Sequence, residues 1–364
     1  MRALASTAGG ISSGGIKLCA FAIAITSLYR PCSPKGLLHT KGYRLRSICL
    51  HRLPFVPLEA LSAGARAQMK IAYALAFVGL LAILSPAADA RRLLQSSSIT
   101  DADILNFALN LECLEAQYYS CAVYGHSISD ELTGNGPQPI GCQQANFTND
   151  DLYSIAMDVA NNEIAHVNYL RTALGNSSVQ CPLVNVGDAF SAAADAALNT
   201  TLSPPFVPYT NDLYFLTGAF IFEDLGVTAY KGALTSFQSS DIMLAAAGIM
   251  AVEAYHAGYI RTALIQNGDV VTPYGANVTT IINAISMARE SLDGSAAMNM
   301  TDDEGIFNST TGDYTLAPVD SNAVAFSRTA SQVLAIAYLN AAGAAGGFFP
   351  NGVNGKVQFT STAM

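Results

Sequence analysis

The residue types best suited to binding a metal form a repeated Glu-x-x-His motif. Residues 163–174 read EIAHVNYLRTAL, and residues 253–264 read EAYHAGYIRTAL. A spacing of three places the glutamate and the histidine one helical turn apart on the same face, so both can reach one ion. Three histidines follow residue 90: His166 and His256 belong to the motif, and His126 falls in a predicted exposed loop. One copy would more often be a solvated helix face, but two matched copies with apolar flanks indicate a metal site.

Two further glutamates carry a fainter repeat. Glu112 is followed seven residues later by Tyr119, and Glu223 by Tyr230, so each pair shares a helix face. One glutamate from each of two helices, with a Glu-x-x-His from each of two others, is the ligand set of di-iron and di-manganese carboxylate bundles. Oxygen-rich ligation suits iron or manganese better than copper, so the sequence predicts a site for two Fe or Mn ions. The predicted metal ligands are Glu112, Glu163, His166, Glu223, Glu253 and His256.

Nearby residues leave alternatives open. Glu115 lies one turn from Glu112 and is an alternative ligand at that position. We prefer Glu112 because its relation to Tyr119 recurs between Glu223 and its tyrosine. Tyr119 and Tyr230 are candidates for donating hydrogen bonds to the site or for electron transfer, and the competing interpretation is that both are ordinary core tyrosines. Asp224 is interpreted as a surface residue or as a hydrogen-bond partner of a ligand.

The helices that must position these residues can be located from their apolar periodicity. Four stretches have it: 101–124, 149–174, 211–237 and 241–266. The first starts at Thr100, a favourable N-cap followed by acids, and the second stops at Gly175. The longest of the three connections between them, 175–210, lies in the middle and includes an Ala-rich turn at 188–198, as a four-helix bundle with one crossover requires. Arg171 and Arg261 lie beyond the ligand turns and are expected to pair with acids at the bundle end.

The sequence after the four helices indicates an extension of the bundle rather than a second bundle. A fifth helix is expected over 279–292, followed by a polar, acidic loop over 302–320 and a short helix over 329–337. A Gly-rich tail, GAAGGFFPNGVNG, comes last. The predicted fold is therefore all-α, with a di-metal four-helix bundle in residues 91–270. The fifth helix and an irregular C-terminal extension, residues 271–364, are expected to pack on it.

The N-terminal region has the composition of targeting sequence. Residues 1–68 carry nine Lys and Arg and a single acid. Residues 69–90 then have a basic start, a short apolar run and the exit Ala-Asp-Ala, which is typical of a secretory signal peptide. Either translation starts at Met69 or residues 1–68 are a transit peptide, and a weaker alternative uses the apolar run over 18–29. We expect a secreted or cell-wall protein, with a thylakoid lumen as the alternative if a transit peptide is present.

Charge excludes some classes of partner. Residues 91–364 contain eight Lys and Arg against 25 Asp and Glu, a net charge of about −17. Nucleic acids and anionic membrane surfaces need clustered cations, so neither is an expected partner. No membrane-spanning segment is expected after removal of the signal, and the sequence predicts no particular oligomeric state. Metal ions, with O₂ or peroxide, are the expected partners.

Cysteines and sequons favour an oxidising compartment. Four cysteines follow the signal, enough for two disulfides, although free buried thiols are the alternative. Cys113 and Cys121 cannot pair on one straight helix, because eight residues of rise separate them by about 12 Å. The other two are Cys142 and Cys181. Six Asn-x-Ser/Thr sequons all lie after the signal, at Asn146, Asn176, Asn199, Asn277, Asn299 and Asn308.

Three segments resemble a known family. They are ILNFALNLECLEAQYY in the first helix, FLTGAFIFEDLGVTAYKGAL in the third, and FSRTASQVLAIAY with GGFFPNGVNG in the tail. From about residue 101 to 356 the chain is similar to plant and algal desiccation-related proteins that carry a ferritin-like domain. The resemblance implies a ferritin-like bundle, a secreted or cell-wall location and an association with drying or other stress. It implies no settled reaction, because members differ in how many metal ligands they keep.

Two functions compete at this point. A di-metal site can oxidise Fe(II) or consume peroxide, because two adjacent ions share the electron transfer. The alternative is a non-enzymatic, stress-protective protein in which the metal only ties the bundle together or is vestigial. Such a protein would be folded, because the hydrophobic content of the chain, 51%, is too high for a disordered protectant. A weaker third hypothesis is a wall-binding module that uses the tail.

Overall fold

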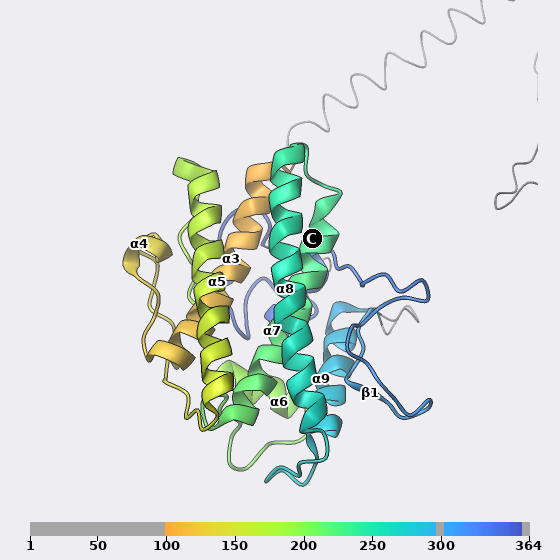
Figure 1. Ribbon diagram of the computed structural model, residues 1–364. Coiled ribbons are helices and arrows are strands. Elements are labelled where there is room, and N and C mark those ends of the chain that lie inside the picture. The colour runs from red at the N-terminus through yellow and green to blue at the C-terminus, as the bar shows by residue number, and fades with distance from the viewer. Residues whose placement is uncertain (1–98, 296–301, 359–364) are drawn as a thin grey trace, which may run out of the picture. The chain divides into compact units, whose positions relative to one another are not determined.

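The computed structural model describes residues 99–295 and 302–358 (Figure 1). The predicted presequence over 1–68, the signal peptide over 69–90 and the sequon at Asn299 lie outside these residues. Within the described part of the chain, no helix is long and apolar enough to cross a membrane. The structure there is helical apart from one hairpin of two short strands, which confirms the all-α prediction.

Four long helices form the bundle. They are α3 (Asp101–Tyr124), α5 (Asp150–Leu174), α7 (Asp212–Leu234) and α8 (Ser240–Gln266). Helix α3 packs on α5 and α7 packs on α8, and the long crossover joins α5 to α7. The crossover contains the 3-10 helix η3 (Gly175–Ser177) and helix α6 (Asp188–Leu198), so the expected Ala-rich turn is in fact a regular helix of 11 residues. The first loop contains a single helical turn, α4 (Asp130–Thr133), which the sequence did not predict.

Local sequence explains where these helices begin. Each of the four has an Asn, Ser or Thr at its N-cap whose side-chain oxygen accepts a hydrogen bond from the backbone of the third helical residue. These caps are Thr100, Asn149, Asn211 and Ser239. Helix α3 ends at Gly125, whose φ of 75° is left-handed and closes the last turn.

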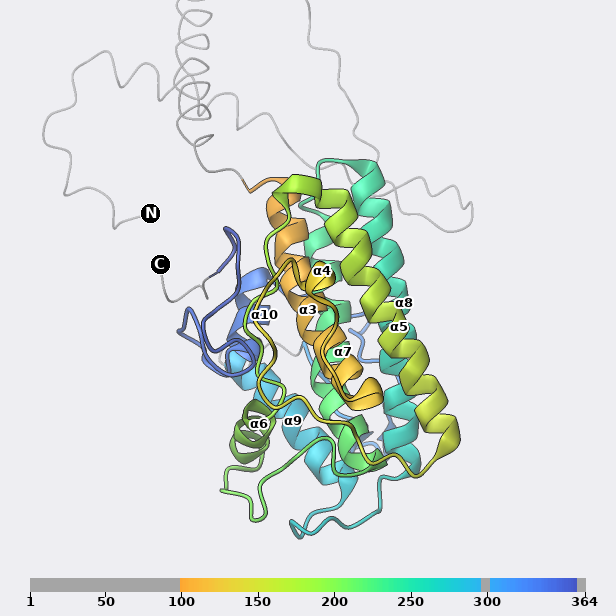
Figure 2. The same cartoon turned by 90° about the vertical axis from the view of Figure 1, so that its left-hand side faces the viewer.

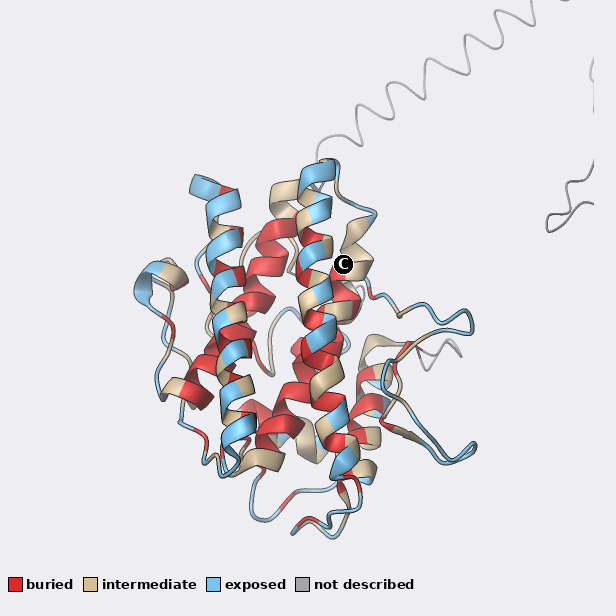
Figure 3. Cartoon of the chain, in the orientation of Figure 1, coloured by how far each residue is buried: buried red, intermediate tan, exposed pale blue. Residues whose placement is uncertain are grey.

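The elements form three layers. Figure 2 shows α3 and α7 between the pair α5 and α8 on one side and α6, α9 (Val278–Asp293) and α10 (Ala330–Ala337) on the other. Helices α5 and α8 keep an exposed outer face, whereas α3 is buried along most of its length (Figure 3). Helix α3 is buried on nearly all sides because the C-terminal extension covers the side that a simple bundle would leave to solvent.

Two disulfides attach the loops to α3. Cys113 pairs with Cys181 in the crossover, and Cys121 pairs with Cys142 in the first loop. Both helical cysteines are fully buried. The prediction that Cys113 and Cys121 do not pair with each other is confirmed, and the alternative of free thiols is wrong.

The C-terminal tail folds back on α3. The side-chain amide of Asn110 donates to the carbonyl of Asn354 at 2.9 Å, and the backbone amide of Asn354 donates to Asn110 Oδ1 at 2.8 Å. Phe348 and Phe349 of the tail are fully buried. The extension also contains the hairpin of β1 (Phe307–Asn308) and β2 (Asp313–Tyr314).

A buried cluster of arginines and aspartates joins α7, α8 and α9 to the extension. Its side chains are linked by ion pairs of 2.7–3.2 Å. This arginine cluster comprises Arg261, Arg289, Arg328, Asp224, Asp293, Asp302 and Asp303. The three guanidinium groups satisfy the acids that they bury, as a buried charge requires.

The arginine cluster corrects several sequence-based expectations. Asp302 and Asp303 are buried rather than part of a solvated acidic loop, because Arg289 and Arg328 reach them from α9 and the segment before α10. Arg261 does pair with an acid, but its partner Asp224 is 4% exposed and lies inside the protein. Arg171 pairs with no acid among the described residues and donates to the backbone carbonyl of Val179.

Candidate metal centre

The four bundle helices bring all six predicted ligands together in the core. One ligand comes from α3 and one from α7, while α5 and α8 contribute a Glu-x-x-His pair each. They form two overlapping groups, and within each group one ligand atom from every residue lies within 4.8 Å of the others. The first group is Glu112, Glu163, His166 and Glu253; the second is Glu163, Glu223 and His256.

Glu163 belongs to both groups. Its Oε2 lies 3.4 Å from Nδ1 of His166, and its Oε1 lies 3.1 Å from Nδ1 of His256. A carboxylate with one oxygen toward each imidazole is in the position to bridge two ions. The three-residue spacing within each motif explains this, because it puts both histidines on the inner face beside their glutamates.

The other three glutamates surround the histidines. Glu112 Oε2 is 3.2 Å and Glu253 Oε1 is 3.5 Å from Nδ1 of His166. Glu223 Oε2 is 3.3 Å from Nδ1 of His256. All four glutamates are at most 1% exposed and both histidines are buried.

Tyr119 and Tyr230 each hold a carboxylate of the other helix in place through a hydrogen bond between α3 and α7. Tyr119 on α3 donates its hydroxyl to Oε1 of Glu223 on α7, and Tyr230 on α7 donates to Oε1 of Glu112 on α3. The sequence correctly put each tyrosine on the face of a ligand. It did not predict that each tyrosine donates to the glutamate of the other helix. Each tyrosine lies two turns beyond the glutamate of its own helix, too far to reach it.

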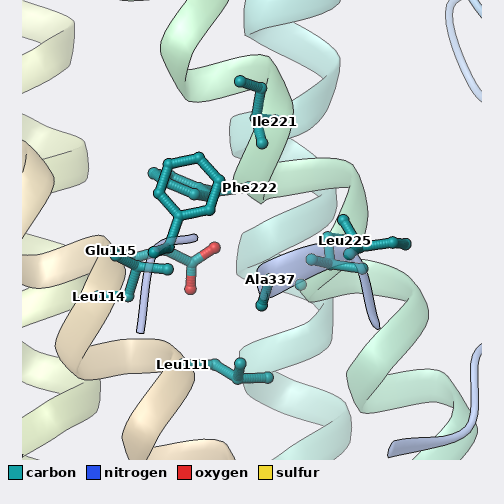
Figure 4. A pocket seen from close by; sticks show the side chains of 10 residues that line it. Leu111, Leu114, Glu115, Ile221, Phe222, Leu225 and Ala337 are labelled. Carbon is teal, nitrogen blue, oxygen red and sulfur yellow. The ribbon is translucent and has the colours of Figure 1, made fainter. Parts of the chain in front are cut away.

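Glu115 is buried beside the site but belongs to neither ligand group. Its side chain is aimed among apolar residues from α3, α7 and α10 (Figure 4). The cavity there has a volume of about 20 Å³, room for one water molecule. Among the described residues Glu115 takes part in no hydrogen bond or ion pair. Burial raises the pKa of Glu115 well above its usual range, and repulsion from Glu253 adds to the rise. The geometry therefore favours Glu112 over Glu115 as the ligand from α3.

Glu115 and the four glutamates predicted as ligands form the carboxylate cluster, whose charges strongly affect one another. Burial, and then repulsion from Glu163, raises the pKa of Glu112 to about 7. Burial and the same repulsion raise the pKa of Glu253 well above its usual value. Burial alone would also raise the pKa of Glu163, but its contacts with the two histidines lower it to about 2. The cluster thus resists holding all its negative charge without cations.

The neighbouring carboxylates favour the charged form of both histidines. Burial alone would lower their pKa values. Contact with Glu163 and Glu223 instead raises the pKa of His256 to about 11, and Glu112, Glu163 and Glu253 raise the pKa of His166. Metal ions bound here would compensate the same carboxylates that favour protonation of the imidazoles.

The unpaired atoms of the cluster test whether metal fits. Both oxygens of Glu163, both of Glu253, one of Glu223 and Nδ1 of His256 are buried with no hydrogen-bond partner among the described residues. Buried carboxylate oxygens without partners are strongly unfavourable unless cations satisfy them. Carboxylates with one imidazole for each ion suit iron or manganese. The residues present therefore fit a pair of such ions.

Sequence reasoning missed two residues around the site. The side-chain amide of Asn162 lies 3.5 Å from Nε2 of His256, the ring nitrogen that faces away from the cluster. Gly226 on α7 brings its backbone against Glu253 and Glu115. A glycine inside a helix is the one signal that could have pointed to such a close approach.

A four-helix bundle with one crossover and this ligand set defines the ferritin-like di-metal carboxylate class. In agreement, the family model described as a ferritin-like domain matches residues 100–266. The chain belongs to the ferritin-like family of desiccation-related proteins.

Two curated relatives are similar over much of the chain. The desiccation-related protein PCC13-62 of Craterostigma plantagineum is 35% identical over 198 residues, which are 53% of this chain and 62% of that protein. The alignment thus spans less than two thirds of that relative. The ferritin-like catalase Nec2 of Nesocodon mauritianus is 30% identical over 272 residues, which are 71% of this chain and 84% of that protein.

Proposed function

We propose that this protein disproportionates hydrogen peroxide at a pair of manganese ions held by the six predicted ligands. The observation that carries the proposal is the position of Glu163 between two histidines, where two ions could share its carboxylate. Adjacent ions suit a reaction that moves two electrons between two substrate molecules. The similarity to a protein named as a catalase supports peroxide as the substrate and manganese as the metal.

In this reaction one peroxide loses two electrons and two protons and becomes O₂. The second peroxide takes up the same two electrons and two protons and becomes two waters. A bound metal pair would supply the storage of two electrons between the two halves. The protein would supply the ligand Glu163 at the centre, and its tyrosines 119 and 230 would hold the carboxylates of Glu223 and Glu112 in place.

The experiment uses the full chain, expressed in a host that forms disulfides and loaded with Mn(II) or Fe(II). We expect about two Mn ions per chain and O₂ release from peroxide. Glu163→Gln should abolish both, because it removes the shared carboxylate, whereas the exposed Glu131→Gln, which removes the same charge, should change neither. Peroxide turnover that survives Glu163→Gln would contradict the proposal. Fe(II) oxidation under O₂ without peroxide turnover would assign the site to an oxidase instead.

The proposed location is outside the cell or in the cell wall. Two disulfides favour an oxidising compartment. The asparagines of four sequons are exposed, as glycosylation requires. They are Asn146, Asn176, Asn199 and Asn308. We expect the protein in the extracellular fluid, with a mobility that shifts after treatment with an N-glycosidase; an unglycosylated protein retained in the cytosol would contradict this.

A second candidate is a protective protein whose metal has only a structural role. The specific observation in its favour is that the six ligands come from four different helices, so that ions would tie the whole bundle together. The similarity to a desiccation-related protein is compatible with it. Chelation that lowers the unfolding temperature of a protein with no turnover of peroxide or Fe(II) would favour this candidate.

A further inference from the structure

The internal repeat of the site is broken at one position. Helices α3 and α7 match at their ligands, Glu112 and Glu223, and again at the tyrosines seven residues later. Three residues after the ligand, however, α3 has Glu115 and α7 has Gly226. A glutamate side chain of five heavy atoms on α3 thus corresponds to no side chain on α7, one turn from the predicted ligands.

Gly226 is where two carboxylates approach α7. A Cβ at this position would lie 2.6 Å from Oε2 of Glu253 and 3.4 Å from Oε1 of Glu115. The first distance is far below a van der Waals contact, so any other residue would push Glu253 aside. The missing side chain on α7 therefore makes room for Glu253, and Glu115 of α3 borders the same space.

The two motif glutamates consequently differ in position. Glu163 reaches both histidines, but Glu253, its counterpart in the repeat, lies near His166 and belongs to the first ligand group alone. One metal position is thus surrounded by four potential ligands and the other by three. Oε2 of Glu253, which would be needed to bridge, instead faces Gly226.

From this geometry we infer that Glu115 and Gly226 make the two metal positions unequal, so that the position of His166 binds its ion more tightly and fills first. Gly226 directs Glu253 to that position, and Glu115 adds a fifth carboxylate on the same side. Glu115 is 5% exposed and has no cationic partner among the described residues, so little water would screen its carboxylate from a cation bound at this position. Glu115 is thus a positioning residue of the metal pair, and the inference rests on the proposed metal site.

The test is an anaerobic titration of the metal-free full chain with Mn(II), in which the electron paramagnetic resonance signal of free Mn(II) reports binding. The wild type should bind two ions in two steps of different affinity. Glu115→Gln should weaken the tighter step about 10-fold to 100-fold and leave the weaker step nearly unchanged. Glu131→Gln, with the same loss of charge at the surface, should leave both steps unchanged.

Gly226→Ala provides a second variant that alters no charge. Its methyl group meets the flexible end of Glu253, so we expect a folded protein in which the two steps move closer together by at least about 10-fold. A single affinity for both ions in the wild type, or unchanged steps in both variants, would overturn the inference. Two unequal steps in a protein without peroxide turnover would overturn only the proposed activity, and absence of Mn(II) binding would overturn both.

Discussion

Two neighbouring residues of α7 belong to two buried ionic clusters, one with paired opposite charges and one with an excess of carboxylates. Glu223 belongs to the carboxylate cluster and Asp224 to the arginine cluster. The arginine cluster matches four aspartates with three arginines, and none of its buried side-chain atoms in the described residues lacks a partner. The five glutamates of the carboxylate cluster have only two histidines beside them, and five of their oxygens have no hydrogen-bond partner among the described residues.

This difference separates a structural cluster from a binding site. The arginine cluster is complete as the chain folds, so it can hold the C-terminal extension against the bundle without any further component. The carboxylate cluster, by contrast, is incomplete when the chain has folded, because its charges need cations that the chain does not provide. The four predictions that follow test this contrast, from the largest expected effect to the smallest.

Breaking the arginine cluster should have the largest effect. Arg289→Met removes the partner shared by Asp224 and Asp303. We expect a loss of about 3 kcal/mol in the free energy of unfolding, at the lower end for a buried pair because each acid keeps another arginine. Urea denaturation measures this loss. Arg171→Met, which loses a bond to a backbone carbonyl, should lower stability by about 1 kcal/mol and serves as the control. Equal losses in the two variants would contradict the role of the cluster.

Adding metal should complete the carboxylate cluster. At a free Mn(II) concentration of 100 times the dissociation constant of the tighter position, we expect the ion bound there to increase the free energy of unfolding by about 2.7 kcal/mol. Thermal unfolding with and without a chelator measures it. Glu163→Gln should show no such increase, because it removes the carboxylate common to both ligand groups. An equal response of wild type and variant would mean that Mn(II) binds elsewhere.

The neighbours on α7 should respond to neutralisation with opposite signs. In the metal-free protein at neutral pH, Glu223→Gln should raise stability, because burial raises the pKa of Glu223 and makes its charge unfavourable. Asp224→Asn should lower stability by about 2 kcal/mol, because it weakens two charged hydrogen-bonded pairs. Urea unfolding of both variants after dialysis against a chelator gives the comparison. Changes of the same sign would show that the clusters do not differ in this way.

The pH dependence of the metal-free protein should also distinguish the clusters. Glu112 has a folded pKa of about 7 against an unfolded value of 4.5, so its contribution to stability is lost as pH rises from 4.5 to 7. Burial alone would raise the pKa of Asp303, but Arg289 and Arg328 lower it, so its contribution is lost only as pH falls below about 4. Each group changes stability by up to about 1.4 kcal/mol per pH unit. Thermal unfolding across this pH range should slope downward from 4.5 to 7, and saturating Mn(II) should remove the slope.

Much of the fold and site could be predicted because they are encoded locally. The N-caps and the glycine stops define the helices, and the boundaries of α3, α5 and α8 were predicted within one residue. The Glu-x-x-His spacing fixes which face of α5 and α8 points inward. Six residues that the sequence singled out therefore lie together in the structure, while their role as metal ligands stays a prediction.

The parts that could not be predicted depend on contacts between distant segments. Asp302 and Asp303 are typical loop residues by composition, and only the packing of Arg289 and Arg328 makes them buried. Asp224 follows a ligand, yet nothing local shows that it turns toward Arg261 on the next helix. The pairing of four cysteines has three possible solutions; helix geometry excludes the one that joins Cys113 to Cys121, and only tertiary structure selects between the other two.

The reciprocal hydrogen bonds between Asn110 and Asn354 also bear on how the protein is made. They join residues 244 positions apart, at the beginning and the end of the described chain. A ribosome that adds about 5–20 residues per second needs roughly 10–50 s to make this interval. Helix α3, which carries the first predicted ligand, therefore waits for this partner until the whole interval has been made. Docking of the C-terminal tail on α3 is thus a late step that can follow the formation of the four bundle helices.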